Sequence, residues 1–183
     1  MSADADDENG RARRTIILVV AAIPAIAGIV ALVFTFAPDL KPCLGDTDAA
    51  FTGAPVFPKV RFHDHLIRNG ARKEDLAGEP NLLGTEVRFS YRTTGYRGRI
   101  LTVTWSLIAI ERDETLGAVV PGQDRAVAMT FTPDACSEGG GKDLFVMIPE
   151  PGRRYRVVLE LYRDRDPDLG DRIALTETEP FRG

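Results

Sequence analysis

The sequence predicts an all-β fold, a seven-stranded antiparallel sandwich that follows one N-terminal transmembrane helix. One observation is an uncharged apolar run near the start of the chain. A second is a series of later segments that alternate apolar and polar residues between turns rich in Gly, Pro and Asp. A third is that no long segment after the apolar run has helical periodicity, which favours sheet-on-sheet packing.

The apolar run predicts a retained membrane anchor at residues 15–37. These 23 residues carry no charge, and as a helix they would be roughly 35 Å long, enough to cross a bilayer. A cleaved signal peptide is the alternative, but its apolar core is shorter. The only acceptable cleavage site ends at Ala37, where Pro38 follows directly and disfavours cleavage.

Charge beside the run predicts the orientation of the chain. Arg11, Arg13 and Arg14 precede it, and flanking arginines stay on the cytoplasmic side. Residues 1–14 are therefore predicted to be a cytoplasmic tail, with the C-terminal domain extracytoplasmic. Arginine far outnumbers lysine, which is typical of high-GC bacteria, so the predicted location is a bacterial cell membrane crossed once.

The part after the anchor has the size of one domain. Its 20 Lys+Arg and 23 Asp+Glu residues give a net charge of −3, and no basic stripe stands out along the sequence. This argues against nucleic acid as a partner. Frequent Pro and Gly predict an extracytoplasmic linker at 38–55, followed by a β-sandwich domain at 56–183.

Seven segments predict the strands of the sandwich. The clearest pair, 85–92 and 99–110, flanks a Gly-containing turn and predicts a hairpin. Residues 63–84 lack alternation and predict a short helix or a loop on the core. The predicted strands are 56–62, 85–92, 99–110, 125–131, 143–148, 153–163 and 172–181.

The stretch PEPGRRYRVVLELYR at 149–163 resembles the strand before last in immunoglobulin-like (Ig-like) and fibronectin type III-like domains. The resemblance implies an Ig-like sandwich over roughly 56–181. It also implies that Tyr155 is a tyrosine corner, bonded to the backbone upstream, and that Trp105 is a core tryptophan. The inter-sheet disulfide of antibody domains is missing, because Cys43 precedes the first predicted strand and Cys136 falls in a predicted loop.

The two cysteines, Cys43 and Cys136, predict one disulfide. Both lie on the side of the membrane where disulfides persist. The bridge would fasten the linker to the domain, and the closed loop of 94 residues would contribute about 4–5 kcal/mol. Two free thiols, or an intermolecular bridge, are the alternative.

Two segments are weak candidates for a metal site. His63 and His65 would share a face in a strand and could bind a metal with a third ligand, although surface histidines are the simpler interpretation. The acidic loop at residues 164–171 resembles a calcium-binding loop, but Leu169 stands where an EF-hand needs Gly. A solvated turn between two strands is the simpler interpretation of this loop. Its carboxylates are Asp164, Asp166, Asp168 and Asp171.

Phosphate-binding and hydrolytic motifs are incomplete. SEGGGK at 137–142 lacks the Ser or Thr after Lys and predicts a flexible loop. No serine nucleophile elbow occurs, and no catalytic residue or cofactor is predicted.

The predicted function is therefore a non-enzymatic one. Residues 15–37 contact the lipid bilayer, and the sandwich binds an envelope protein, a polymer or a second copy, or has a structural role. The alternatives are a metal- or ligand-binding sensor or enzyme that uses His63 and His65 or the Asp164–Asp171 loop, and an accessory subunit of a membrane complex.

Overall fold

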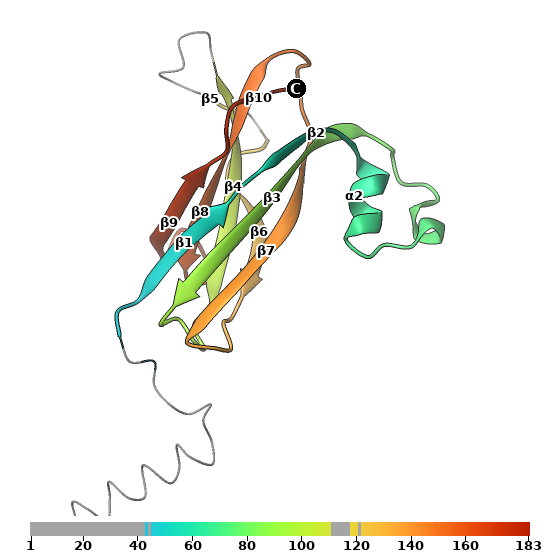
Figure 1. Cartoon of the computed structure of the whole chain (residues 1–183). Helices are drawn as coiled ribbons and strands as arrows, with labels where there is room; N and C mark the ends of the chain where they lie inside the picture. The colour runs from blue at the N-terminus through green and yellow to red at the C-terminus, as the bar shows by residue number, and fades with distance from the viewer. Residues whose placement is uncertain (1–42, 44, 111–117, 121) are drawn as a thin grey trace, which may run out of the picture. The chain divides into compact units, whose positions relative to one another are not determined.

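The structure, a computed structural model, describes residues 43, 45–110, 118–120 and 122–183. The described chain is predominantly β (Figure 1). The predicted helix at 15–37 lies outside the described residues, and none of the described helices is long and apolar enough to cross a membrane. The strands are β1 Asp48–Gly53, β2 Val56–Arg61, β3 Leu83–Thr94, β4 Leu101–Ile110, β5 Ala118–Val119, β6 Ala126–Phe131, β7 Ser137–Val146, β8 Arg154–Arg163, β9 Asp171–Glu177 and β10 Phe181–Arg182.

Two antiparallel sheets make up the domain. In one sheet β3 is central, with β7 along one edge and β1 and β2 in succession along the other. In the other sheet β8 and β4 are central; β9 and β10 follow the free edge of β8, and β5 and β6 follow that of β4. All pairings are antiparallel, as the alternating segments predicted.

The core lies between the sheets and follows the alternation of β3, β4 and β8. Val87, Phe89 and Tyr91 of β3 point inward. They meet inward residues of β4 and β8, such as Val103 and Leu159, which are fully buried. Because side chains alternate across a strand, Glu86 and Arg88 are left on the outer face of β3.

The predicted boundaries need three corrections. The sandwich begins before residue 56, because β1 occupies part of the predicted linker 38–55 and pairs with the end of β3. Residues 137–142 are the start of β7 rather than a flexible loop. The predicted strand 172–181 is divided into β9 and β10.

The three glycines in β7 explain the second correction. They lie opposite Ser90, Tyr91 and Arg92 of β3. A side chain at Gly140 would place its Cβ 2.5 Å from the hydroxyl oxygen of Tyr91. The strand therefore needs glycine for close packing, whereas the same residues in sequence are typical of a loop.

Two features of the resemblance are present in the described fold. The Tyr155 hydroxyl donates to the carbonyl of Glu150 at 3.1 Å and accepts from the Glu150 amide at 3.2 Å, as expected of a tyrosine corner. Trp105 is partly buried against the core.

The domain has two distinct ends. The Cys43–Cys136 disulfide is formed, with Cα atoms 5.4 Å apart. Cys136 lies just before β7, where its carbonyl accepts from the Gly95 amide, so the bridge marks the end of the sandwich at which β3 finishes. The opposite end holds the start of β3 at Leu83, the start of β8 and the C-terminus (Figure 1).

Candidate functional site

An insert between β2 and β3 stands on the end opposite the disulfide. It contains α2 (Phe62–Arg68) and the short 3-10 helix η2 (Lys73–Leu76). The Phe62 amide donates to the Leu82 carbonyl at 2.8 Å, which closes the insert at its base. Asn69 stabilises the last turn of α2, because its side-chain amide donates to the His65 carbonyl. The insert is therefore an ordered part of this end.

Aromatic packing holds α2 against the outer face of the sheet. Phe62 packs against Phe145 of β7 with ring centroids 5.0 Å apart, and His65 lies 5.5 Å from the same ring. Gly84 of β3 makes room for Phe145, since a Cβ at Gly84 would lie 2.4 Å from the ring. The ring thus fills the space between the sheet and the helix.

Glu86 is the polar centre of this contact and is fully buried. Arg68 of α2 donates to its carboxylate at 2.5 Å, and His65 Nδ1 lies 3.0 Å from the same oxygen. Arg88 Nε donates to the other oxygen at 2.8 Å and also lies 3.5 Å from Asp143. The carboxylate is therefore bonded by two cations and one imidazole, as a buried charge requires.

These partners determine the pKa of Glu86. Burial alone would raise it, but hydrogen bonds from Arg68, His65 and Arg88, and the charge of Arg68, lower the pKa from 4.5 to about 2. The carboxylate is thus ionised at neutral pH and holds α2 onto the sheet.

This low pKa predicts how stability depends on pH. The stabilisation by ionised Glu86 is complete above its unfolded pKa near 4.5 and is lost as pH falls towards 2. We expect the free energy of unfolding of wild type to exceed that of Glu86→Gln at neutral pH, and the difference to shrink below pH about 4.5. Urea denaturation at several pH values measures it. A difference that stays constant down to pH about 3 would contradict this role.

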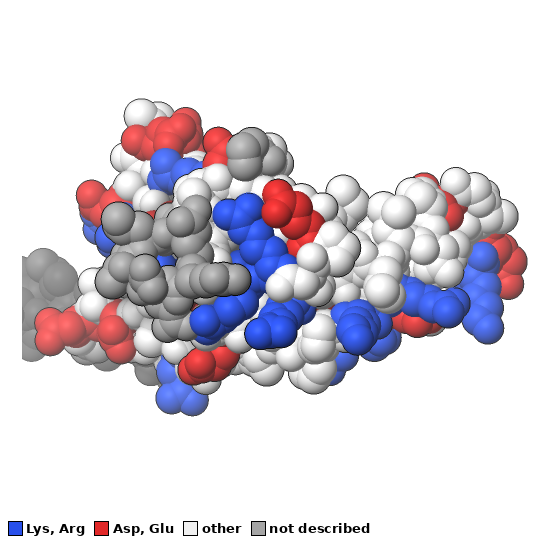
Figure 2. All heavy atoms as spheres, turned by 90° about the horizontal axis from the view of Figure 1, so that it is seen from above, with Lys and Arg blue, Asp and Glu red and all other residues white. Residues whose placement is uncertain are grey.

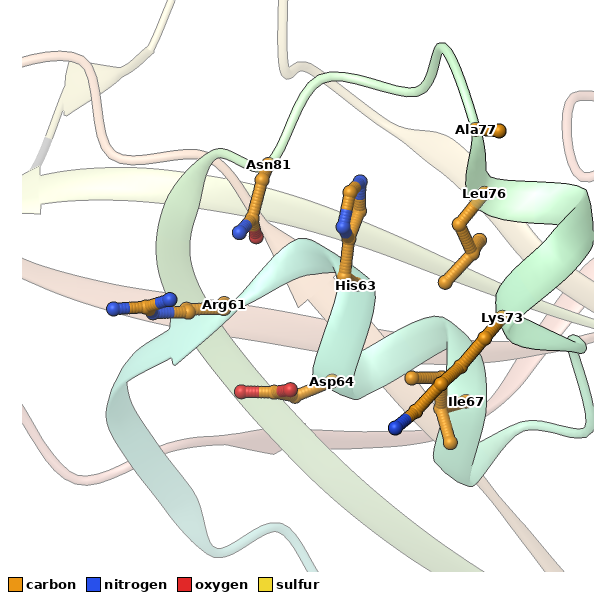
Figure 3. A pocket seen from close by; sticks show the side chains of 8 residues that line it. All are labelled: Arg61, His63, Asp64, Ile67, Lys73, Leu76, Ala77 and Asn81. Atoms are coloured by element: carbon orange, nitrogen blue, oxygen red, sulfur yellow. The ribbon is translucent and has the colours of Figure 1, made fainter.

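A cavity of about 360 Å³ lies between α2 and η2. Figure 3 shows His63 rising from α2 between Asn81 and Leu76, with Lys73 extending alongside Ile67. The His63 ring is held in place because Nε2 lies 2.8 Å from the Glu79 carbonyl. Arg61, at the end of β2, and Asp64 lie on the other side of His63 (Figure 3). The remaining lining residue is Ala77.

The predicted histidine pair is not assembled as a metal site. His63 and His65 lie in a helix rather than a strand, so residues two apart point in different directions. His65 is 8% exposed and faces Glu86, whereas His63 is on the cavity side. Among the described residues no group of three metal-ligating side chains is close enough to hold a metal ion.

The carboxylates of the acidic loop do not converge on one point. Asp168 pairs with Arg125, and Asp171 pairs with Arg163 at 2.5 Å. Asp164 and Asp166 accept from backbone amides within the loop, at Arg165 and Asp168 respectively. The loop is therefore a turn whose charges are used locally.

Basic side chains gather where no stripe is visible in the sequence. Figure 2, which views the molecule from above, shows Lys and Arg in a row that few acidic residues interrupt. The strands at this end supply Lys59 and Arg61 from β2, Arg182 from β10 and Arg154 from β8, and β2 lies beside β10. We call these four residues the basic row. Arg61 also lines the cavity beside His63.

Comparison with known proteins provides no family. No family model matches the chain, and no curated protein matches it. Among solved structures, it is similar to the crystal structure of the Bordetella pertussis protein assigned as ApaA. The identity is 12% and the TM-score 0.18, over 72% of this chain and 93% of that one. A likeness of this size carries no argument about function.

Proposed function

We propose that the chain is a non-enzymatic, single-pass protein of the bacterial envelope that displays an Ig-like or fibronectin type III-like sandwich outside the cell. The strand order supports the finer fold: a β1/β2–β3–β7 sheet faces a β9/β10–β8–β4–β6 sheet, and Tyr155 forms the corner. The uncharged run at 15–37 supports the anchor. The disulfide supports an oxidising exterior.

The observation that carries the binding role is the difference between the two ends. The chain enters the domain at Cys43, where the disulfide fastens it, and the basic row lies at the opposite end. Within the described residues, Lys59, Arg61 and Arg182 form no ion pair with an acidic side chain. Unpaired cations in a domain of negative net charge favour an anionic partner at this end.

Site-specific photo-crosslinking in intact cells tests the proposal. A photoreactive residue at Arg61 should give a UV-dependent shift on a gel, because this position faces the partner. The matched control is Leu175, which is exposed on β9 and outside the basic row, and which should give none. A band at twice the mass would identify a second copy as the partner. Equal crosslinking at both positions would contradict a binding surface at the basic end.

The location is tested in the same cells. A tag on Gly183 should be cut by protease added to whole cells, since the domain is outside. A tag that is cut only after lysis would overturn the extracytoplasmic placement and the envelope role.

A further inference from the structure

The arrangement of the basic row identifies the chemistry of its partner more closely. Arg154 and Arg182 are directly opposite in the β8–β10 ladder, and like charges on directly opposed residues are destabilising. Arg154 has a partner of its own, but Arg182 forms no ion pair with the described acidic residues. The repulsion is relieved when an anion lies beside Arg182.

Lys59 is also exposed, and its backbone adopts an unfavourable conformation. It lies in an irregular part of β2, where the register with β3 shifts between Phe57 and Val60. Its φ of 58° is in the left-handed region, which is unfavourable for a residue other than glycine. Bulges of this kind re-aim side chains at functional positions, and the Lys59 side chain is exposed.

The form of the surface favours a chain-like ligand. β10 and β2 lie beside each other, and Figure 2 shows basic side chains spread along this end of the molecule rather than gathered at one enclosed point. Guanidinium groups bind phosphate oxygens in a bidentate manner, which suits arginine-rich sites. Phe57 is the one aromatic among the exposed large apolar residues of the described chain, and Arg88 lies over its ring at 4.4 Å. The row therefore lacks the stacking platform that single-stranded nucleic acids use.

We propose that the basic row binds a linear polyanion of linked phosphate groups without bases, laid across β10 and β2. This inference rests on the proposed function, because it names the partner class of the same surface. The phosphates contact Arg182, Lys59 and Arg61, and Arg154 adds to the positive potential.

Binding of long-chain inorganic polyphosphate to the full-length chain in phosphatidylcholine nanodiscs tests this inference. With three cations engaged, the affinity should fall roughly 20-fold between about 50 mM and 200 mM salt. Arg61→Glu with Arg182→Glu should weaken binding at least about tenfold. The matched control, Arg92→Glu with Arg99→Glu, makes the same charge change at the disulfide end and should weaken it less than about threefold. Equal losses in the two double variants would overturn the inference.

Two further arms define the ligand. Poly-L-glutamate of matched length should compete at least about tenfold less well than polyphosphate; equal competition would overturn the preference for phosphate. In nanodiscs enriched in phosphatidylglycerol, polyphosphate binding should persist. Loss of polyphosphate binding in these nanodiscs would show that the basic row binds lipid headgroups, and it would overturn the proposal of a polymeric ligand. Thermal unfolding of each variant checks that the fold is retained. If Arg61 crosslinks in cells while polyphosphate does not bind, the inference of a phosphate polymer is wrong, and the proposed binding function of this end still holds.

Discussion

Replacing both cysteines, Cys43→Ser with Cys136→Ser, should lower the free energy of unfolding by about 4–5 kcal/mol. The bridge joins residues 93 apart in sequence, so its loss releases a long closed loop in the unfolded chain. Urea denaturation of the full-length chain in detergent measures the effect, with Trp105, the single tryptophan, as the fluorescent probe. The oxidised wild type should also migrate faster than the double variant on a non-reducing gel.

Reductant provides the control for this prediction. Wild type treated with reductant should unfold at the urea concentration of the double variant, and the variant should not respond to reductant. A double variant as stable as the oxidised wild type would show that the bridge constrains nothing beyond what β1 already fixes through its pairing with β3.

The second large effect is expected at Glu86. Glu86→Ala removes the buried, ionised acceptor of Arg68, Arg88 and His65. It should lower the free energy of unfolding by roughly 3 kcal/mol, because three hydrogen bonds to a charged group are lost and the buried His65 ring is left without its partner. The insert should also open locally. Limited trypsin digestion should therefore cut faster after Arg68 and Lys73, while cleavage elsewhere changes less.

Asp143→Asn is the matched control for Glu86→Ala. Asp143 contacts Arg88 at 3.5 Å and its side chain is 26% exposed, so its charge is screened and its removal should cost less than about 1 kcal/mol. An insert that remains equally resistant to trypsin in Glu86→Ala would show that the aromatic packing of Phe62 on Phe145 holds α2 by itself.

Strict alternation made the central strands predictable from the sequence. β3, β4 and β8 each place bulky apolar residues at every second position, because one face of each strand packs on the core between the sheets. β1 was missed because it combines small residues with flanking Gly and Pro, so its signal resembled a linker. The start of β7 was missed because its glycines are required by contact with β3, and that contact is not visible in the local pattern.

The candidate site was predictable only in part. The sequence indicated a short helix or loop at 63–84 and singled out His63 and His65, as surface histidines or, in a strand, as a weak metal pair. It did not indicate that His65 would be buried against Glu86. Alternation in β3 placed Glu86 on the outer side, yet its burial depends on α2, which comes from another segment. The basic row joins Lys59 and Arg61 to Arg182, more than a hundred residues later, so only the folded sheets bring these cations together.

The position of the disulfide has a mechanical consequence. Tension applied between the N-terminal segment and the C-terminus passes through the sulfur–sulfur bond to Cys136 and bypasses the strands from β1 to β6. Those strands cannot be drawn out while the bond is intact. Within the domain, stretching can extend only the residues after Cys136, where β10 is held to β8 by two residue pairs and β7 is held to β3 along a register that runs from Thr85 to Thr94.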